Sequence, residues 1–380
     1  MKELLKYRKA VLVELNAMLK LSKENIDKFR LEQIINLLEY IERAIDCNSV
    51  ENLDCIKNSY ERIHRIASDN VDSDIEAFHS FNMYIENHSR KLQNLYQNKC
   101  KGISGLDTGL VALDDITYGL PKDHLIVVAG RPSVGKTSLI ANFVQHAGID
   151  LKLPVAVFSL EVGGCEFVNR MICSMTNCSN RKFQDAAMRD GDWCNYASKL
   201  STAQNAPIFV DDEKGLTVDE IRSRLIKLEK NVGPLSLIVV DNLQLIKPAP
   251  LNGVSDKRFG DFAEISHGLK SIAREMNVPV VVTSQVNRAV EARPNHRPQL
   301  WDLSESGAIE NDADIVLCLY RDEIYNKATC DKNVAEITVA KNRNGPTGTA
   351  RLRFEGQFFR FSNLPQEGEL PPSDVMGLVD

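Results

Sequence analysis

Glycine and proline are absent from the start of this chain of 380 residues until Gly102. These two residue types interrupt helices more strongly than any others, so nothing before Gly102 breaks a helical pattern. Apolar residues recur in this part at roughly helical spacing, for example at Leu12, Leu15 and Leu19. We therefore expect residues 1–100 to be helical.

Long apolar runs are also absent. No run approaches the roughly 18 residues that a membrane helix needs, and the frequent charges at the N-terminus do not fit a secretory signal. The nine cysteines form no CxxC pair. This scatter argues against a disulfide framework or a zinc site, and it favours reduced thiols in the cytoplasm.

An excess of basic residues is missing too, because the formal net charge is −6. Any basic surface that binds nucleic acid must therefore be confined to a small part of the protein.

At this length two domains are expected. Residues 364–380 contain Pro and acidic side chains, and we expect them to form a flexible acidic tail.

The pattern changes after Gly102, where Gly and Pro become frequent and short apolar runs appear. The predicted strands are Leu125–Ala129, Val155–Phe158, Ile208–Val210, Leu237–Val240, Val278–Thr283 and Ile315–Leu319. Several runs are continuous rather than alternating, which is typical of strands covered on both faces. Helical segments lie between them, such as 218–230, which Thr217 and Glu220 open as a capping box. This alternation predicts an α/β fold with a parallel sheet.

A phosphate-binding loop follows the first of these strands. Residues 130–137 fit the pattern G-x-x-x-x-G-K-[ST], between a predicted strand and a predicted helix. The expected nucleotide contacts are Gly130, Arg131, Pro132, Ser133, Val134, Gly135, Lys136, Thr137 and Ser138. Lys136 should reach the β- and γ-phosphates of ATP, and the Thr137 hydroxyl should bind Mg²⁺.

Two acidic residues follow later strands. Asp241 ends the run LIVVD and can support the metal, although a carboxylate there could also be a simple capping residue. Glu161 follows the strand 155–158, where a surface glutamate would be unremarkable. In RecA-like ATPases, a glutamate at the end of the strand after the phosphate loop polarises the attacking water. Glu161 has the corresponding position in the order of predicted strands, and the resemblance therefore implies this role.

Further segments make the resemblance specific. They are 108–120 (TGLVALDDITYGL), 130–138 (GRPSVGKTS), 158–161 (FSLE), 237–246 (LIVVDNLQLI), 284–288 (SQVNR), 302–314 (DLSESGAIENDAD), 319–325 (LYRDEIY) and 341–348 (KNRNGPTG). In this order they closely resemble the C-terminal motor domain of DnaB-type replicative helicases. The resemblance implies a RecA-like P-loop domain with a mostly parallel central sheet over 102–363, preceded by an all-α N-terminal domain and a linker helix.

The family forms hexameric rings around one DNA strand, with ATP bound between subunits. By position, Glu161 is the implied general base, and Gln285 the residue that senses the γ-phosphate. Lys341 and Arg343 resemble the pair that reaches the neighbour's ATP site, with Arg343 as an arginine finger. A solvated basic turn before Gly345 is the alternative.

Loops that line the ring channel are expected to bind single-stranded DNA. In the family the segment matching Ser304, Glu305, Ser306 and Gly307 follows the phosphate backbone, and an arginine is usual at the position of Ser304. A second candidate surface contains Lys247, Lys257 and Arg258. A third contains Arg288, Arg293 and Arg297, although solvated surface charge is an equal alternative for both surfaces. Asn242 is another departure, because the family usually carries an aromatic residue there.

The N-terminal part matches the family less well. Residues 76–101 fit the linker helix, and 1–75 remain for a reduced, collar-like helical domain. The apolar stripe of 76–98 is expected either to pack within its own chain or to dock on a neighbouring subunit. The short N-terminal part is typical of a phage, plasmid or prophage version, in a bacterial cell or phage-infected host.

Three functions fit these features. The first is an ATP-driven helicase that translocates 5′→3′ on single-stranded DNA, with a helicase loader, primase or other replisome proteins as possible partners. The second is a recombinase-like or regulatory ATPase without processive unwinding, and the third is a non-motor module that hydrolysis switches. The Lys341 and Arg343 pair favours a ring or filament over the third function, and DLSESG and SQVNR favour a helicase over a recombinase.

Overall fold

The computed structural model describes residues 81–97, 104–248, 258–303 and 306–365. The chain divides into two compact units, residues 1–94 with 226–233, and residues 95–225 with 234–380. The predicted collar-like domain, nearly all of the acidic tail and the residues Lys257, Ser304 and Glu305 lie outside the described residues. Within the described ranges, no helix is long and apolar enough to cross a membrane.

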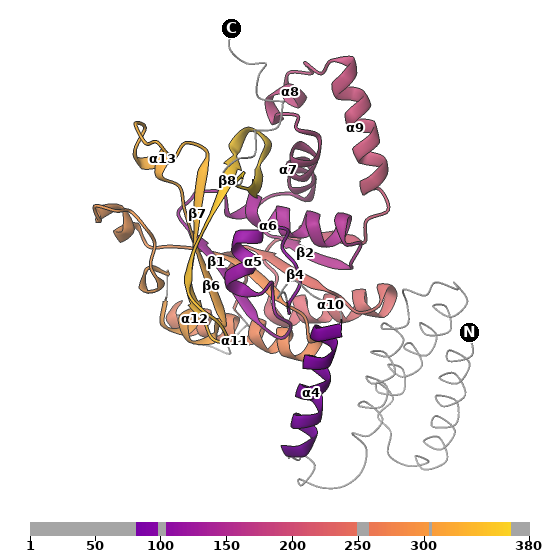
Figure 1. Cartoon of the computed structure of the whole chain (residues 1–380), viewed down its shortest axis with the longest axis vertical. Helices are drawn as coiled ribbons and strands as arrows, with labels where there is room; N and C mark the ends of the chain where they lie inside the picture. The colour runs from indigo at the N-terminus through magenta and orange to yellow at the C-terminus, as the bar shows by residue number, and fades with distance from the viewer. Residues whose placement is uncertain (1–80, 98–103, 249–257, 304–305, 366–380) are drawn as a thin grey trace, which may run out of the picture. The chain divides into compact units, whose positions relative to one another are not determined.

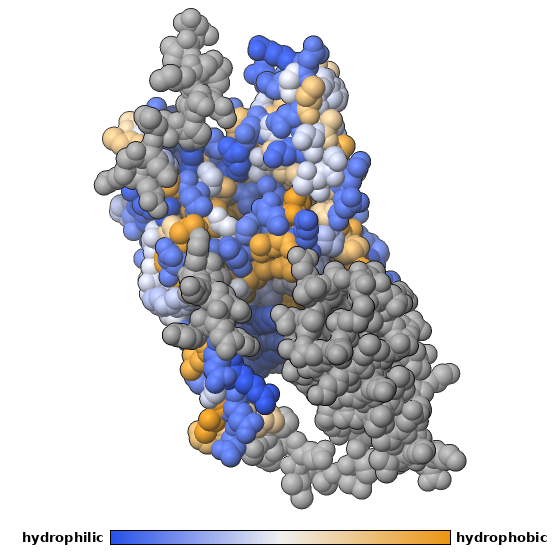
Figure 2. Space-filling model, turned by 45° about the vertical axis from the view of Figure 1, so that its right-hand side comes forward, coloured by the Kyte–Doolittle hydropathy of each residue, from blue (hydrophilic) through white to orange (hydrophobic). Residues whose placement is uncertain are grey.

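Most of helix α4 (Phe81–Gln97) belongs to the first unit. It lies inside the range 76–98 in which the sequence predicts a helix. Its apolar side chains Phe81, Tyr84, Ile85 and Leu92 are exposed. Figure 2 shows apolar and polar side chains together on this helix. The choice between packing within the chain and docking on a neighbour stays a prediction.

A nine-stranded sheet forms the centre of the second unit, as far as its residues are described (Figure 1). The strands are β1 (Leu125–Gly130), β2 (Val155–Ser159), β3 (Ile208–Asp211), β4 (Leu237–Asp241), β5 (Val280–Gln285), β6 (Ile315–Tyr320), β7 (Val334–Asn342), β8 (Gly348–Glu355) and β9 (Arg360–Asn363). Their spatial order is β3-β2-β4-β5-β1-β6-β7-β8-β9. All neighbours from β3 to β6 are parallel, and those from β6 to β9 are antiparallel.

The six predicted strands are therefore confirmed, and so is the mostly parallel sheet. The fifth strand begins at Val280 rather than Val278, since Pro279 has no N–H to donate to a ladder. Strands β7, β8 and β9 were not among the predicted ones. Burial alternates along β7 and β8, as expected for antiparallel strands with one face less covered.

Helices cover both faces of this sheet (Figure 1). The α-helices described after α4 are α5 (Val111–Thr117), α6 (Lys136–Gln145), α7 (Gly164–Thr176), α8 (Asn180–Gln184), α9 (Asp190–Ala203), α10 (Val218–Val232), α11 (Arg258–Met276), α12 (Ser306–Asp312) and α13 (Asp322–Tyr325), of which α8, α9 and α13 do not lie on the sheet. On one face, Phe143 of α6 and Leu113 of α5 join the main apolar core with alternate residues of the strands. Ile221 of α10 and Leu269 of α11 are fully buried but belong to no part of that core. They cover the other face, because successive strand residues point to opposite faces.

Helix α10 begins as its sequence predicts. The Glu220 carboxylate accepts hydrogen bonds from the Thr217 N–H and hydroxyl at 2.8 and 3.0 Å, and the Glu220 N–H donates to the Thr217 hydroxyl at 3.3 Å. The capping box is therefore confirmed.

A Cβ on Gly268 of α11 would lie 2.6 Å from the Val218 side chain, so a glycine is needed where α10 and α11 meet.

Candidate active site

The phosphate-binding loop joins the end of β1 to the first residue of α6. Gly130 is the last residue of β1, and Lys136 is the first residue of α6. Gly135 has a φ of 114°, a left-handed conformation in which a side chain would be strained. A Cβ there would also lie 3.3 Å from the Phe361 ring. The N-terminus of a helix carries unpaired backbone N–H groups that favour an anion, so the start of α6 is suited to bind phosphate.

The Lys136 ammonium lies inside the curve of this loop. It is 9% exposed and donates to the carbonyl oxygens of Gly130 at 2.9 Å and Arg131 at 3.1 Å. Burial lowers the pKa of Lys136, while the nearby carboxylates of Asp241 and Glu161 oppose that shift. Its charge therefore lies near two acids, Asp241 at the end of β4 and Glu161 shortly after β2.

Asp241 is fully buried at the end of β4. Its carboxylate accepts a hydrogen bond from the Thr137 hydroxyl at 2.7 Å, and its second oxygen accepts one from the Thr283 hydroxyl. Burial raises the pKa of Asp241, and these two hydrogen bonds oppose the shift. A hydroxyl and a carboxylate are hard oxygen ligands, so Thr137 and Asp241 fit the expected Mg²⁺. Thr283 was not singled out from the sequence, where a polar residue inside the apolar run VVVTSQ was the available signal.

Glu161 lies beside Asp241 because the ends of β2 and β4 are joined. The Leu160 and Glu161 N–H groups both donate to the Asp241 carbonyl oxygen, at 2.6 and 3.0 Å. The Glu161 side chain is exposed, and its Oε2 accepts a hydrogen bond of 2.6 Å from the Asn242 amide. Two carboxylates that are 80 positions apart in the sequence thus meet at one end of the sheet.

Gln285 occupies the same end of the sheet. It is the last residue of β5 and pairs in register with Gly130 of β1. The segment after it is attached to the phosphate-binding loop, because Arg131 donates to the Val286 carbonyl oxygen at 3.1 Å and pairs with Glu291 at 2.8 Å. The structure therefore brings together Lys136, Thr137, Glu161, Asp241 and Gln285.

Lys341 and Arg343 lie elsewhere. The Lys341 ammonium donates to the Glu310 carbonyl oxygen, and the Arg343 guanidinium to that of Asn311. The Arg343 N–H donates to the Asp314 carbonyl oxygen at 3.0 Å, directly before β6 begins. Because β6 runs parallel to β1, this edge is opposite the phosphate-binding loop. The six residues of β1 rise about 3.3 Å each, so the two edges are about 20 Å apart.

The expected DNA-binding residues are only partly described. Ser306 begins α12, and Gly307 is exposed. Arg258 begins α11. Lys247 is exposed, and its N–H donates to the Leu216 carbonyl oxygen at 2.9 Å.

The third basic surface contains two arginines with intramolecular partners. Arg293 pairs with Asp302, and Arg297 pairs with Glu336 through hydrogen bonds of 2.7 and 2.9 Å. The Arg297 guanidinium also lies 4.6 Å from the centre of the Tyr320 ring. These contacts favour a structural role for both arginines over contact with phosphate.

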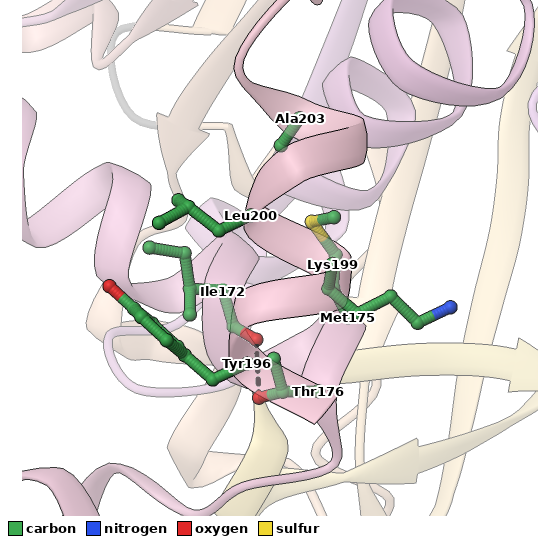
Figure 3. Close-up of a pocket in the computed structure, with 7 residues that line it drawn as sticks. All are labelled: Ile172, Met175, Thr176, Tyr196, Lys199, Leu200 and Ala203. Carbon is green, nitrogen blue, oxygen red and sulfur yellow. Dashed lines mark hydrogen bonds between the residues drawn. The ribbon is translucent and has the colours of Figure 1, made fainter. Parts of the chain in front are cut away.

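A hollow between α7 and α9 lies outside this group of residues (Figure 3). It is lined by Ile172, Met175, Thr176, Tyr196, Lys199, Leu200 and Ala203. Most of these side chains are apolar, and the Thr176 hydroxyl donates to the Ile172 carbonyl oxygen at 2.8 Å. None of the residues predicted for the nucleotide site contributes to it.

Comparisons with known proteins agree with the geometry. The family model of the DnaB-like helicase C terminal domain matches residues 105–363. The chain is 44% identical over 271 residues to the replicative DNA helicase DnaB of Pasteurella multocida, covering 71% of this chain and 57% of that protein. It is 41% identical over 278 residues to the replicative DNA helicase DnaC of Bacillus subtilis, covering 72% and 61%. The chain thus spans less than two thirds of the length of these relatives.

Solved structures show the same likeness. A separately solved ATPase domain matches with a TM-score of 0.70 and 32% identity, over 76% of this chain and 100% of that chain. A DnaB-like replicative helicase, described with its interactions with primase, matches with a TM-score of 0.68 and 30% identity, over 89% and 77%. Since the family model covers more than half of the sequence and the same fold recurs in these structures, the chain belongs to the DnaB-like helicase family.

Proposed function

We propose that this chain is an ATP-driven replicative DNA helicase that acts as a hexameric ring and translocates 5′→3′ on single-stranded DNA. One observation supports this proposal above the others. Lys136, Thr137, Asp241 and Glu161 lie together at one edge of the sheet, while Arg343 lies at the opposite edge. A subunit built this way holds most of one ATP site and the missing arginine of another, as head-to-tail assembly requires.

Each residue of the proposed site has a separate role in ATP hydrolysis. Lys136 binds the β- and γ-phosphates, and Thr137 and Asp241 hold Mg²⁺, which when bound neutralises charge on the phosphate oxygens. The Glu161 carboxylate accepts a proton from water as the water oxygen attacks the γ-phosphorus. The bond from that phosphorus to the β–γ bridging oxygen breaks, giving ADP and phosphate. Arg343 of a neighbouring subunit stabilises the charge on the transferred group.

The DNA-facing side follows from the same arrangement. Gln285 is adjacent to the loop at Gly130, and its strand leads into the segment that ends at 304–307. We assign Gln285 to sensing the γ-phosphate and 304–307 to the DNA backbone, with Lys247, Lys257 and Arg258 as a second contact surface. Residues 1–75 are proposed as a reduced collar and 76–101 as the linker helix. Primase and a helicase loader are proposed partners, since one similar helicase was described with primase.

Exchange of Lys136 for Ala tests the site. We expect Lys136→Ala to abolish ATP hydrolysis stimulated by single-stranded DNA, because the phosphate-binding loop loses its buried cation. Lys332→Ala removes an exposed lysine before β7 and is the matched control. Turnover that persists in Lys136→Ala would refute the site assignment.

Strand displacement on forked DNA tests the helicase assignment separately. We expect unwinding of a duplex with a 5′ single-stranded tail and not of one with a 3′ tail. ATP hydrolysis stimulated by DNA, without displacement on either substrate, would favour the recombinase-like or regulatory alternative.

A further inference from the structure

Asn242 directly follows the buried acid of β4 and contacts the proposed general base. Its side chain is only 2% exposed, and its Nδ2 donates to Oε2 of Glu161 at 2.6 Å. The reverse orientation of the amide would place its oxygen against a carboxylate oxygen, so the donor must face Glu161. The contact therefore has a defined direction.

The oxygen of the Asn242 amide indicates that the contact with Glu161 does not serve to stabilise the fold. Among the described residues, Asn242 Oδ1 is one of the buried side-chain oxygens that has no hydrogen-bond partner. A buried acceptor without a partner costs free energy, and an apolar residue of similar size would avoid that cost. Sites that break such a local rule are more often functional than structural.

The surroundings show what the contact does to Glu161. The backbone of Glu161 is fixed by its hydrogen bond to the Asp241 carbonyl oxygen, but its side chain is exposed. Among the residues that the structure describes, Asn242 is the group that donates a hydrogen bond to the Glu161 carboxylate, so it fixes the position of one carboxylate oxygen. Glu161 also acts electrostatically on Lys136, so the anchored carboxylate stays near the phosphate-binding loop.

We propose that Asn242 is a positioning residue for hydrolysis, which holds one Glu161 oxygen so that the other is free to take the proton from water. The inference rests on the proposed role of Glu161 as general base. It also assigns a function to the asparagine at a position where the family usually carries an aromatic residue. A hydrogen bond to the charged carboxylate is strong enough to matter for a group that must be ionised and oriented at once.

The test measures steady-state ATP hydrolysis of the full chain with single-stranded DNA. We expect Asn242→Ala to lower kcat about 10- to 100-fold, as for a lost hydrogen bond to a charged group, with little change in KM for ATP. In a Glu161→Gln background the same exchange should have no further effect, because the two side chains act as a unit. Asn169→Ala, which removes an amide donor to Asn180 between α7 and α8, is the matched control.

A pH profile separates positioning from a packing defect. Asn242→Asp keeps the shape but places a second carboxylate beside Glu161, which disfavours its ionised form. The acid limb of the kcat profile should then move to higher pH, and a packing defect would not move it. Binding of a fluorescent ATP analogue and thermal denaturation check that each variant is folded, and Asn242→Gln, which restores a donor, should recover part of the activity.

The outcomes that overturn the inference differ from those that overturn the function. If Glu161→Gln retains full turnover, the general base is wrong, and the inference fails with it. If Glu161→Gln is inactive while Asn242→Ala and Asn242→Asp behave as the native chain, only the positioning role fails. A rise in DNA-independent turnover in Asn242→Ala would also overturn it, since Asn242 would then restrain Glu161 rather than place it.

Discussion

Arg343 gives the sharpest test of the ring. Its own phosphate-binding loop lies about 20 Å away across the sheet, so no side-chain rotation brings the guanidinium to that loop. The guanidinium instead lies 3.6 Å from the Asp314 carboxylate at the start of β6. If Arg343 acts in hydrolysis, it must act on ATP bound to another subunit.

The expected magnitudes follow from that geometry. Removing an arginine finger costs about 10³- to 10⁵-fold in rate, so uniform Arg343→Ala rings should be inactive. Uniform Glu161→Ala rings should be inactive for lack of the base. In an equal mixture, an interface is active only when an Arg343→Ala subunit supplies Glu161 and a Glu161→Ala neighbour supplies Arg343, which is about one quarter of head-to-tail interfaces.

The assay is ATP hydrolysis at constant total protein over a series of mixing ratios. Activity should rise from near zero at both ends to a maximum at equal amounts, and energy transfer between labelled subunits should show that mixed rings form. Arg351→Ala serves as the matched control, because Arg351 is an exposed arginine on β8 that pairs with Asp331. Its mixture with Glu161→Ala should change in proportion to the active subunits, without a maximum.

One result would refute the reasoning. If subunits exchange freely and no ratio restores hydrolysis, the base and the finger do not come from different subunits. The Lys341 and Arg343 pair would then be a solvated basic turn, and the separation across the sheet would have no catalytic meaning.

Two further predictions concern stability and DNA binding. Burial raises the pKa of Asp114 to about 7, although the Thr108 hydroxyl donates to its carboxylate. The folded chain therefore binds the extra proton below that pH, and stability should fall by about 1.4 kcal/mol from pH 6 to pH 8. Thermal denaturation should show this fall in the native chain and not in Asp114→Asn, and an equal fall in both would contradict it. Exchange of Lys247 for Ala should lower affinity for single-stranded DNA irrespective of sequence and reduce the salt slope by about one unit, with Lys332→Ala as control. An unchanged slope in fluorescence anisotropy would remove Lys247 from the DNA surface.

The parallel half of the sheet could be predicted from the sequence because its strands are buried on both faces. Continuous apolar runs such as 125–129 and 237–240 indicate strands of this kind, and each acidic or polar residue that follows them is placed at one edge by parallel pairing. The phosphate-loop motif and the strand that ends in an acid indicated Lys136 and Asp241, whereas the roles of Glu161 and Gln285 came from the resemblance to the helicase family. The strands β7, β8 and β9 could not be found this way, because burial alternates along β7 and β8 and β9 has only four residues.

Contacts between side chains could not be predicted from the sequence. Nothing in the residue pattern shows that Arg297 pairs with Glu336, which favours a structural role over DNA contact. The contact between Asn242 and Glu161 could not be predicted either, since it depends on the hydrogen bonds that join the end of β2 to the end of β4. Such contacts depend on which loops meet in space, and local periodicity carries no information about this.

One carboxylate connects the two halves of the proposed site within a subunit. Asp314 accepts a hydrogen bond of 2.8 Å from the Leu125 N–H at the start of β1 and pairs with Lys270 at 2.5 Å. The same carboxylate faces Arg343, and β1 ends in the phosphate-binding loop. A packed, fully buried strand is stiff. Asp314 therefore links Arg343 to the strand that carries the subunit's own phosphate-binding loop.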